Sequence, residues 1–200
     1  IESDNIHPRK IEEFVGRETK KVNAVMRAAA EDTLDRLKIG RMHPELVRLL
    51  GHLRFRTSYG QNVLDHTYEC AKISAQMAAE LGLSASIGMR AGLLHDIGKA
   101  VDFETEGTHP ELGEVLCQKY GESVEVAHAA GHHHDDMESS TPYTVIVSAA
   151  DAISGGRPGA RRQANADFAK RMQQFEEIAH SFQGIEHAYA IQAGRELRLI

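Results

Sequence analysis

Apolar residues recur every three or four positions along most of this chain, which is the spacing of one buried face of an α-helix. The longest such stretch runs from residue 8 to residue 38, with Pro8 in its first turn and Gly40 as its stop. Its apolar stripe suits either packing against its own domain or the tail of a coiled coil or dimer helix. Helices are also predicted at residues 43–50, 61–81, 84–97, 109–120, 122–134, 143–154 and 164–182, and a polar loop is predicted at residues 54–62.

The hydrophobic period changes near the C-terminal end of the chain. Residues 189–193 and 196–200 alternate around Gly194 and Arg195, which predicts two short strands joined as a hairpin. The fold is therefore expected to be all-α, a helical bundle with a long N-terminal helix and a small C-terminal β-hairpin. Three parts are expected: residues 1–42 as an N-terminal helix and linker, 43–165 as the central domain, and 166–200 as a helix-plus-hairpin extension.

The composition narrows the class of protein. Its 200 residues are 42% hydrophobic and 26% charged, as in soluble globular domains, and the net charge of −6 gives no overall basic signature for nucleic acid. Cys70 and Cys117 lie far apart and form no CxxC motif, so a reducing, cytoplasmic compartment is expected. No signal peptide or membrane-spanning run is visible. Because the chain begins at Ile1 within a charged segment, we expect it to be a soluble fragment of a longer protein.

Twelve histidines are the one compositional outlier, and several of them are expected to face inward beside carboxylates. His95 and Asp96 interrupt an apolar run, and His66 falls on the apolar face of its predicted helix. Asp151 lies within another apolar helix. Buried imidazoles and carboxylates are costly without a partner, and a divalent cation would satisfy both. Mixed nitrogen and oxygen ligands suit Mn, Fe, Ni, Zn or Co better than Ca.

Further candidate ligands lie in the middle of the chain. His109 begins a predicted helix, and His132, His133 and His134 end another. Taken alone, His109 reads as an exposed cap residue and the triplet as chance or an adventitious surface metal site. However, His133 and His134 continue an apolar stripe, whereas His132 lies on the other side of the helix. The full set exceeds what one ion takes, and two ions bridged by Asp96 would accommodate it. Two ions about 3.5–4 Å apart stabilise the attacking and leaving oxygens of a phosphoester displacement.

One loop of the chain is both basic and rich in glycine. It spans residues 155–162, with the sequence GGRPGARR. The simplest interpretation is a solvated loop. The functional interpretation is a phosphate clamp made by Arg157, Arg161 and Arg162, because guanidinium forks match phosphate oxygens.

The order His66…His95-Asp96…Asp151 resembles the H…HD…D pattern of the HD superfamily of metal-dependent phosphohydrolases, which have an all-helical fold. The additional His109 and the His133–His134 pair resemble its two-metal branch. This resemblance implies one or two divalent ions, with Mn, Fe, Mg, Zn and Ni as candidates.

Longer motifs narrow the resemblance to the ribonuclease Y family of bacterial endoribonucleases, which start mRNA decay. The similar stretches are RTSYGQNVL (56–64), AGLLHDIGKA (91–100), AADAIS (149–154), RPGARR (157–162) and AYAIQAGRE (188–196). The resemblance implies single-stranded RNA as substrate, a homodimer, and a parent protein anchored at the inner face of the bacterial cell membrane. It also implies a coiled coil and a KH RNA-binding domain before residue 1, and an HD domain over residues 43–165.

The resemblance also implies roles for individual residues. His66, His95, Asp96 and Asp151 would hold a first ion, and Asp96, His109, His133 and His134 a second. His133 and His134 align with the family pair because Asp136 and Glu138 then fall in register. Asp96 would be catalytic, and Lys99 would steady phosphate oxygens. Arg157, Arg161 and Arg162 would grip the RNA backbone, and Tyr59 would stack on a base.

Two other functions compete with the ribonuclease. The first is a phosphodiesterase or phosphohydrolase for nucleotides or cyclic dinucleotides, because the same chemistry cleaves any phosphoester. The second is a non-catalytic dimerisation domain whose histidines are structural, which should hold no stoichiometric ion.

Overall fold

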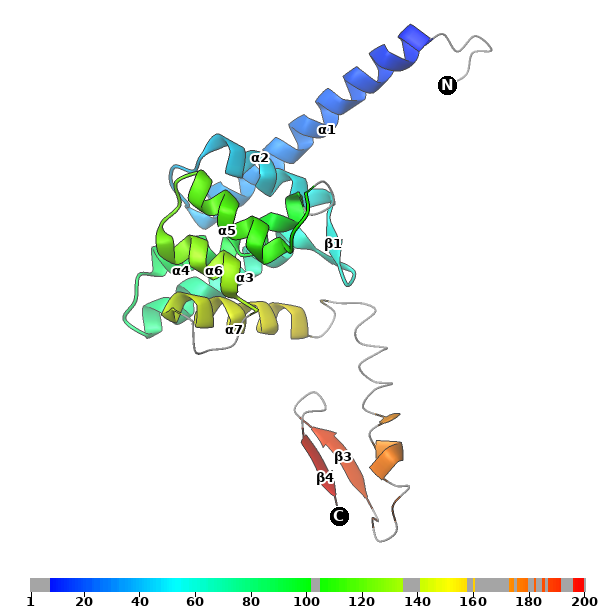
Figure 1. Cartoon of the computed structure of the whole chain (residues 1–200), viewed down its shortest axis with the longest axis vertical. Helices are drawn as coiled ribbons and strands as arrows, with labels where there is room; N and C mark the ends of the chain where they lie inside the picture. Colours follow the sequence, from blue (N-terminus) through cyan, green and yellow to red (C-terminus); the bar gives the residue numbers. More distant parts are fainter. Residues whose placement is uncertain are drawn as a thin grey trace. The chain divides into compact units, whose positions relative to one another are not determined.

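The helices predicted from the hydrophobic pattern are present in the computed structural model of the chain, which describes residues 8–101, 105–134, 141–157, 160, 173, 174, 176–179, 182, 185, 187–191 and 196–199. The elements are α1 (Pro8–Leu37), α2 (Pro44–His52), the 3₁₀ turn η1 (Leu53–Phe55), β1 (Thr57–Ser58), β2 (Gln61–Asn62), α3 (Val63–Glu80), α4 (Ala85–Leu94), the 3₁₀ turn η2 (Ile97–Ala100), α5 (His109–Lys119), α6 (Val124–His132), α7 (Pro142–Gly156), β3 (Ala188–Ile191) and β4 (Glu196–Leu199). The predicted all-α class with a small hairpin is therefore confirmed (Figure 1).

The chain forms two compact units. The first comprises residues 1–57 and 62–154, and the second comprises residues 58–61 and 155–200. In the second unit, β3 and β4 pair antiparallel with Ala188 opposite Leu199, which confirms the predicted hairpin. Most of the predicted helix at 164–182 lies outside the described residues. Of its described residues, 173–174 and 176–179 are helical and Phe182 is not. None of the described helices is both long and apolar enough to cross a membrane.

Local chemistry explains where the helices of the first unit begin. Ser84 is the N-cap of α4, and its hydroxyl accepts a hydrogen bond from the backbone N–H of Ile87 at 3.4 Å. Thr108 and Glu111 form a capping box at the start of α5, with Pro110 in the first turn. Each cap satisfies backbone donors that have no partner within the helix.

The core of the first unit is a set of fully buried aliphatic side chains from α2, η1, α3, α4, η2, α6 and α7: Leu46, Leu49, Leu50, Leu53, Val63, Leu93, Leu94, Ile97, Val126 and Val147. Helices α3 and α4 approach closely because Gly88 and Gly92 lie at their contact. A Cβ added at Gly88 would lie 2.8 Å from the Ser74 carbonyl oxygen, and one at Gly92 would lie 2.7 Å from that of Cys70. The two glycines therefore allow α3, which contains His66, to lie close to α4, which ends just before His95.

Only the C-terminal part of α1 packs into this core, through Ala30, Leu34 and Leu37. The apolar residues nearer its start are 42–56% exposed: Ile11, Phe14, Val15, Val22 and Val25. The N-terminal part of α1 projects from the other helices of its unit (Figure 1). The expectation that α1 packs against its own domain thus holds for its last two turns among the described residues.

Two sequence predictions of local structure were wrong. Residues 54–62 were predicted to be a polar loop but contain η1 and the paired strands β1 and β2. Tyr59 (φ 50°) and Gly60 (φ 84°) both adopt left-handed conformations, the requirement of a tight two-residue hairpin turn. The helix predicted at 84–97 ends at Leu94, because Asp96 leaves helical geometry with φ −100° and ψ 13° and a 3₁₀ turn follows.

Helix α7 is attached to its neighbours by polar bonds as well as by the core. The Tyr143 hydroxyl accepts a hydrogen bond from the backbone N–H of Ser84 at 3.0 Å. Thr144 Oγ1 lies 2.9 Å from Nδ1 of His128 on α6. Ser148 Oγ donates to the carbonyl of His133. Along its length α7 therefore contacts residues next to or within α4 and α6.

Candidate metal centre

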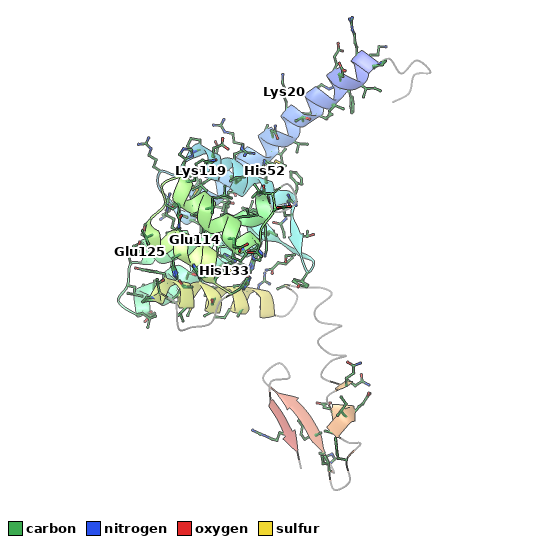
Figure 2. All side chains as sticks on the ribbon, in the orientation of Figure 1. Lys20, His52, Glu114, Lys119, Glu125 and His133 are labelled. Carbon is green, nitrogen blue, oxygen red and sulfur yellow. The ribbon has the colours of Figure 1, made fainter. Side chains whose placement is uncertain are left out.

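The histidines and carboxylates predicted to share a site come together from five helices of the first unit. His66 lies in the first turns of α3, and Asp151 lies in α7. His95 and His133 are the C-cap residues of α4 and α6, and His109 is the first residue of α5. Figure 2 shows His133 where α6 meets α7. The site is thus built mainly at helix ends, which a bundle can bring together without breaking its core.

Asp96 lies at the centre of this cluster, and its two carboxylate oxygens face different partners. Oδ2 lies 3.8 Å from Nε2 of His66 and 3.6 Å from Nε2 of His95. Oδ1 lies 3.5 Å from Nε2 of His109 and 3.9 Å from Nε2 of His133. This division matches the two ligand sets expected from the sequence, with Asp96 between them.

The remaining predicted ligands complete the two sides. Asp151 Oδ1 lies 3.1 Å from Nε2 of His66. On the other side, ligand nitrogens of His109, His133 and His134 all lie within 4.8 Å of one another, close enough to hold one ion. His95, Asp96 and His133 form another such group.

Two of the histidines are held with their Nε2 atoms facing the cluster. Nδ1 of His95 lies 2.8 Å from the Gly92 carbonyl oxygen, and Nδ1 of His133 lies 3.0 Å from that of Ala130. A carbonyl only accepts, so each Nδ1 carries the proton and each neutral ring presents a lone pair at Nε2. That tautomer and orientation are what a metal ligand needs.

Four buried polar atoms of the cluster have no hydrogen-bond partner among the described residues: Nε2 of His95, His109 and His133, and Oδ1 of Asp96. Buried polar atoms without partners are costly, and several that converge on one point need a common ligand. A divalent cation would accept all of their lone pairs. The residues present therefore fit a metal ion of the N/O-binding transition series.

The electrostatics of the cluster favour the metal-binding protonation states. Burial lowers the pKa of His133 to about 3 and that of His109 to about 4, so both rings are neutral at pH 7. Burial also lowers the pKa of His95. For Asp96, burial acts to raise the pKa, but the charge and hydrogen bond of Lys99 act against it, and the pKa lies well below its usual value. The centre therefore offers neutral imidazoles around an ionised carboxylate.

Lys99 provides a cation beside the cluster. Its Nζ donates a hydrogen bond to Asp96 Oδ2 at 2.7 Å, and its side chain is 21% exposed. The 3₁₀ turn η2 allows this contact, because Lys99 lies three residues after Asp96. Lys99 thus lies between the carboxylate and solvent.

The histidine triplet divides between two places. His133 is buried in the cluster, and the ring of His134 lies 5.3 Å from that of His109. His132 instead stacks on His128 with 4.3 Å between ring centroids, and its Nε2 lies 3.5 Å from Glu114 Oε2. His133 and His134 therefore both lie beside His109, whereas His132 contacts His128 and Glu114.

The predicted RNA-binding residues lie outside this cluster or outside the described residues. Tyr59 and Arg157 belong to the second unit, and both are exposed. Arg161 and Arg162 lie outside the described residues, as do Asp136 and Glu138.

Sequence reasoning missed two residues that contact His66 and a third residue that contacts one of them. Cys70 Sγ lies 3.7 Å from Nδ1 of His66, and the buried Ser154 hydroxyl lies 3.0 Å from the same atom. Ser154 in turn contacts Glu69. Helical spacing was the available signal, because Glu69 and Cys70 lie one turn after His66 and Ser154 lies one turn after Asp151.

Comparison with known proteins finds a family model that is similar to the part of the chain that holds the cluster. Residues 63–156, which include every residue of the cluster, match the family model described as HD domain. The chain is 53% identical over all 200 residues to "Ribonuclease Y" of Desulforamulus reducens, where it covers 39% of that protein. It is 52% identical to "Ribonuclease Y" of Thermoanaerobacter pseudethanolicus and 50% identical to that of Syntrophotalea carbinolica, covering 39% and 38% of them, again over its whole length.

The chain therefore spans about two fifths of the length of the curated relatives it matches. No solved structure matches it.

Proposed function

We propose that this chain belongs to the HD-domain family and hydrolyses phosphodiester bonds of single-stranded RNA in a metal-dependent reaction, because residues 63–156 match the HD-domain model and the whole chain is 52–53% identical to two proteins named ribonuclease Y. The observation that carries the proposal is the Asp96 carboxylate between two sets of inward-facing imidazole nitrogens. The relatives are named ribonuclease Y, which supports RNA as the substrate.

The proposed division of ligands follows the two oxygens of Asp96. His66, His95, Asp96 and Asp151 hold one ion, and Asp96, His109, His133 and His134 hold a second. Mn, Fe, Mg, Zn and Ni are the candidate ions, because the donors are imidazole nitrogens and carboxylate oxygens. When bound, such ions supply a water nucleophile near neutral pH and neutralise charge at the reacting phosphate.

The residues of the chain itself supply orientation and charge. The backbone anchors on His95 and His133 fix the direction of their lone pairs before any ion binds. We assign to Lys99, which is half-buried beside Asp96, the donation of hydrogen bonds to phosphate oxygens. We assign Arg157, Arg161 and Arg162 to the RNA backbone and Tyr59 to base stacking.

The wider organisation is also proposed. We propose that the chain acts as a homodimer within a parent anchored at the inner face of the cell membrane. The proposal extends to the three parts 1–42, 43–165 and 166–200, with the metal centre in the second.

The experiment that tests this function combines metal analysis with RNA cleavage. The untagged wild type is expected to retain a stoichiometric divalent ion and to cleave a 5′-monophosphorylated single-stranded RNA in the presence of Mn²⁺. Asp96→Ala should lose both properties, and Asp35→Ala, which removes an exposed carboxylate from α1, should lose neither. Retention of ion and cleavage by Asp96→Ala contradicts the proposal.

Parallel assays separate the competing functions. Cleavage of a cyclic dinucleotide in preference to RNA would identify a nucleotide phosphodiesterase. Absence of any stoichiometric ion in the wild type would identify a non-catalytic domain.

A further inference from the structure

A chain of two hydrogen-bond contacts leads from His66 away from the metal centre. The Ser154 hydroxyl on α7 lies 3.0 Å from Nδ1 of His66 and donates to Glu69 Oε2 at 2.7 Å. Ser154 is fully buried and His66 is 4% exposed. Because Glu69 and His66 are both on α3, the two contacts connect these residues through Ser154 of α7.

The direction of the hydrogens follows from the groups involved. A serine hydroxyl carries one hydrogen, and a carboxylate can only accept, so the hydrogen of Ser154 lies toward Glu69. The same oxygen can then only accept from His66, which places a proton on Nδ1. The other ring nitrogen, Nε2, faces Asp151 Oδ1 at 3.1 Å and Asp96 Oδ2 at 3.8 Å. These contacts orient Nε2 toward the ion.

His66 needs this side-chain partner because of its place in the helix. His95 and His133 are C-cap residues, and the carbonyls that anchor them belong to last helical turns, whose carbonyls have no partner within the helix. His66 lies near the start of the 18-residue helix α3, where the carbonyl three residues earlier accepts a helical bond. The carbonyl in the equivalent position is therefore not open to its Nδ1.

We propose that Ser154 and Glu69 are positioning residues that hold the imidazole of His66 for the ion on its side of Asp96. The proposal rests on the metal centre proposed above. Partners that orient a metal-ligating histidine typically contribute 10–100-fold to metal affinity.

The test is calorimetric titration of Mn²⁺ into the chelator-treated, untagged 200-residue chain near neutral pH, without substrate. His66→Ala identifies the binding event that depends on His66. Ser154→Ala should weaken that event by about 10–100-fold and leave binding at the His109 side unchanged. Glu69→Gln keeps an acceptor oxygen but removes the charge, so a smaller loss is expected.

Ser74→Ala is the matched control. It removes a fully buried hydroxyl from α3 that has no hydrogen-bond partner among the described residues, and its Mn²⁺ affinity should equal that of the wild type. Thermal unfolding of the metal-free variants should give similar midpoints for Ser74→Ala and Ser154→Ala, which separates positioning from folding.

The outcomes distinguish this proposal from the metal centre itself. If the wild type binds Mn²⁺ stoichiometrically and Ser154→Ala binds it equally tightly, the positioning role of Ser154 is wrong and the metal centre is supported. If Ser154→Ala weakens every binding event equally and alone has a lowered unfolding midpoint, Ser154 has a structural role and the positioning role is also wrong. If the wild type binds no stoichiometric Mn²⁺, both the metal centre and the positioning role are wrong.

Discussion

Acidification of the metal-free protein should destabilise it through its buried neutral histidines. His133 is 2% exposed, and burial lowers its pKa from 6.5 to about 3. Between these two values the unfolded chain binds a proton at this residue and the folded chain does not. The free energy of unfolding therefore falls as the pH drops below about 6.5 and continues to fall toward pH 3.

The size of the effect follows from the two pKa values of His133. At about pH 5, protonation of this residue in the unfolded chain alone should lower the free energy of unfolding by about 2 kcal/mol relative to pH 8. Burial shifts the pKa of His95 and His109 in the same direction, so both add to the loss. Asp96 and Asp151, whose pKa values are lowered from 3.8, contribute only at more acidic pH.

Urea unfolding followed by far-ultraviolet circular dichroism, in the presence of a chelator, measures this loss. The matched variant is His133→Gln, which keeps a polar side chain but cannot titrate. Its loss of stability between about pH 8 and pH 5 should be smaller than that of the wild type by about 2 kcal/mol. Equal losses in the two proteins would refute the view that His133 is buried in its neutral form.

Two further predictions concern how the site is supported. A Cβ at Gly98 would lie 2.0 Å from the His109 carbonyl oxygen. Gly98→Ala should therefore lower the free energy of unfolding, measured in urea, by about 1–3 kcal/mol and weaken the Mn²⁺ binding at His109 that calorimetry measures. Gly40→Ala, whose added Cβ would meet open space, should change neither quantity. Arg90, whose side chain is 23% exposed, pairs with Glu122, whose side chain is 3% exposed. Arg90→Ala leaves this carboxylate without its partner and should cost about 1–3 kcal/mol in urea unfolding, and no measurable cost would contradict a stabilising pair.

Several ligands of the metal centre could be predicted from the sequence, because helical spacing and residue type are local properties. His66 and Asp151 lie on apolar faces of predicted helices, and both reach the cluster. The arrangement around Asp96 could not be predicted from the same rule, because the helix ends at Leu94 and a 3₁₀ turn follows. A regular helix would have placed Asp96 at the edge of the buried stripe.

Contacts between residues distant in sequence could not be predicted from hydrophobic periodicity. Ser154 and Glu69 are 85 positions apart, and their hydrogen bond depends on how α7 packs on α3. The hairpin at residues 57–62 was missed for a different reason: Tyr59 adopts a positive φ that is uncommon for a bulky residue. Local propensity therefore predicts an irregular loop where the turn forms.

The polar attachment of α7 makes this helix a reporter of the metal centre. Asp151 contributes to the cluster, Ser148 bonds the carbonyl of His133, and Tyr143 at the far end bonds Ser84. An ion held by Asp151 would oppose local opening of the whole helix, because its turns open together. Amide hydrogen exchange should therefore slow along α7 when Mn²⁺ is added, out to residues near Tyr143 that touch no ligand. Loading of the centre could then be monitored in the resting protein, without RNA or turnover.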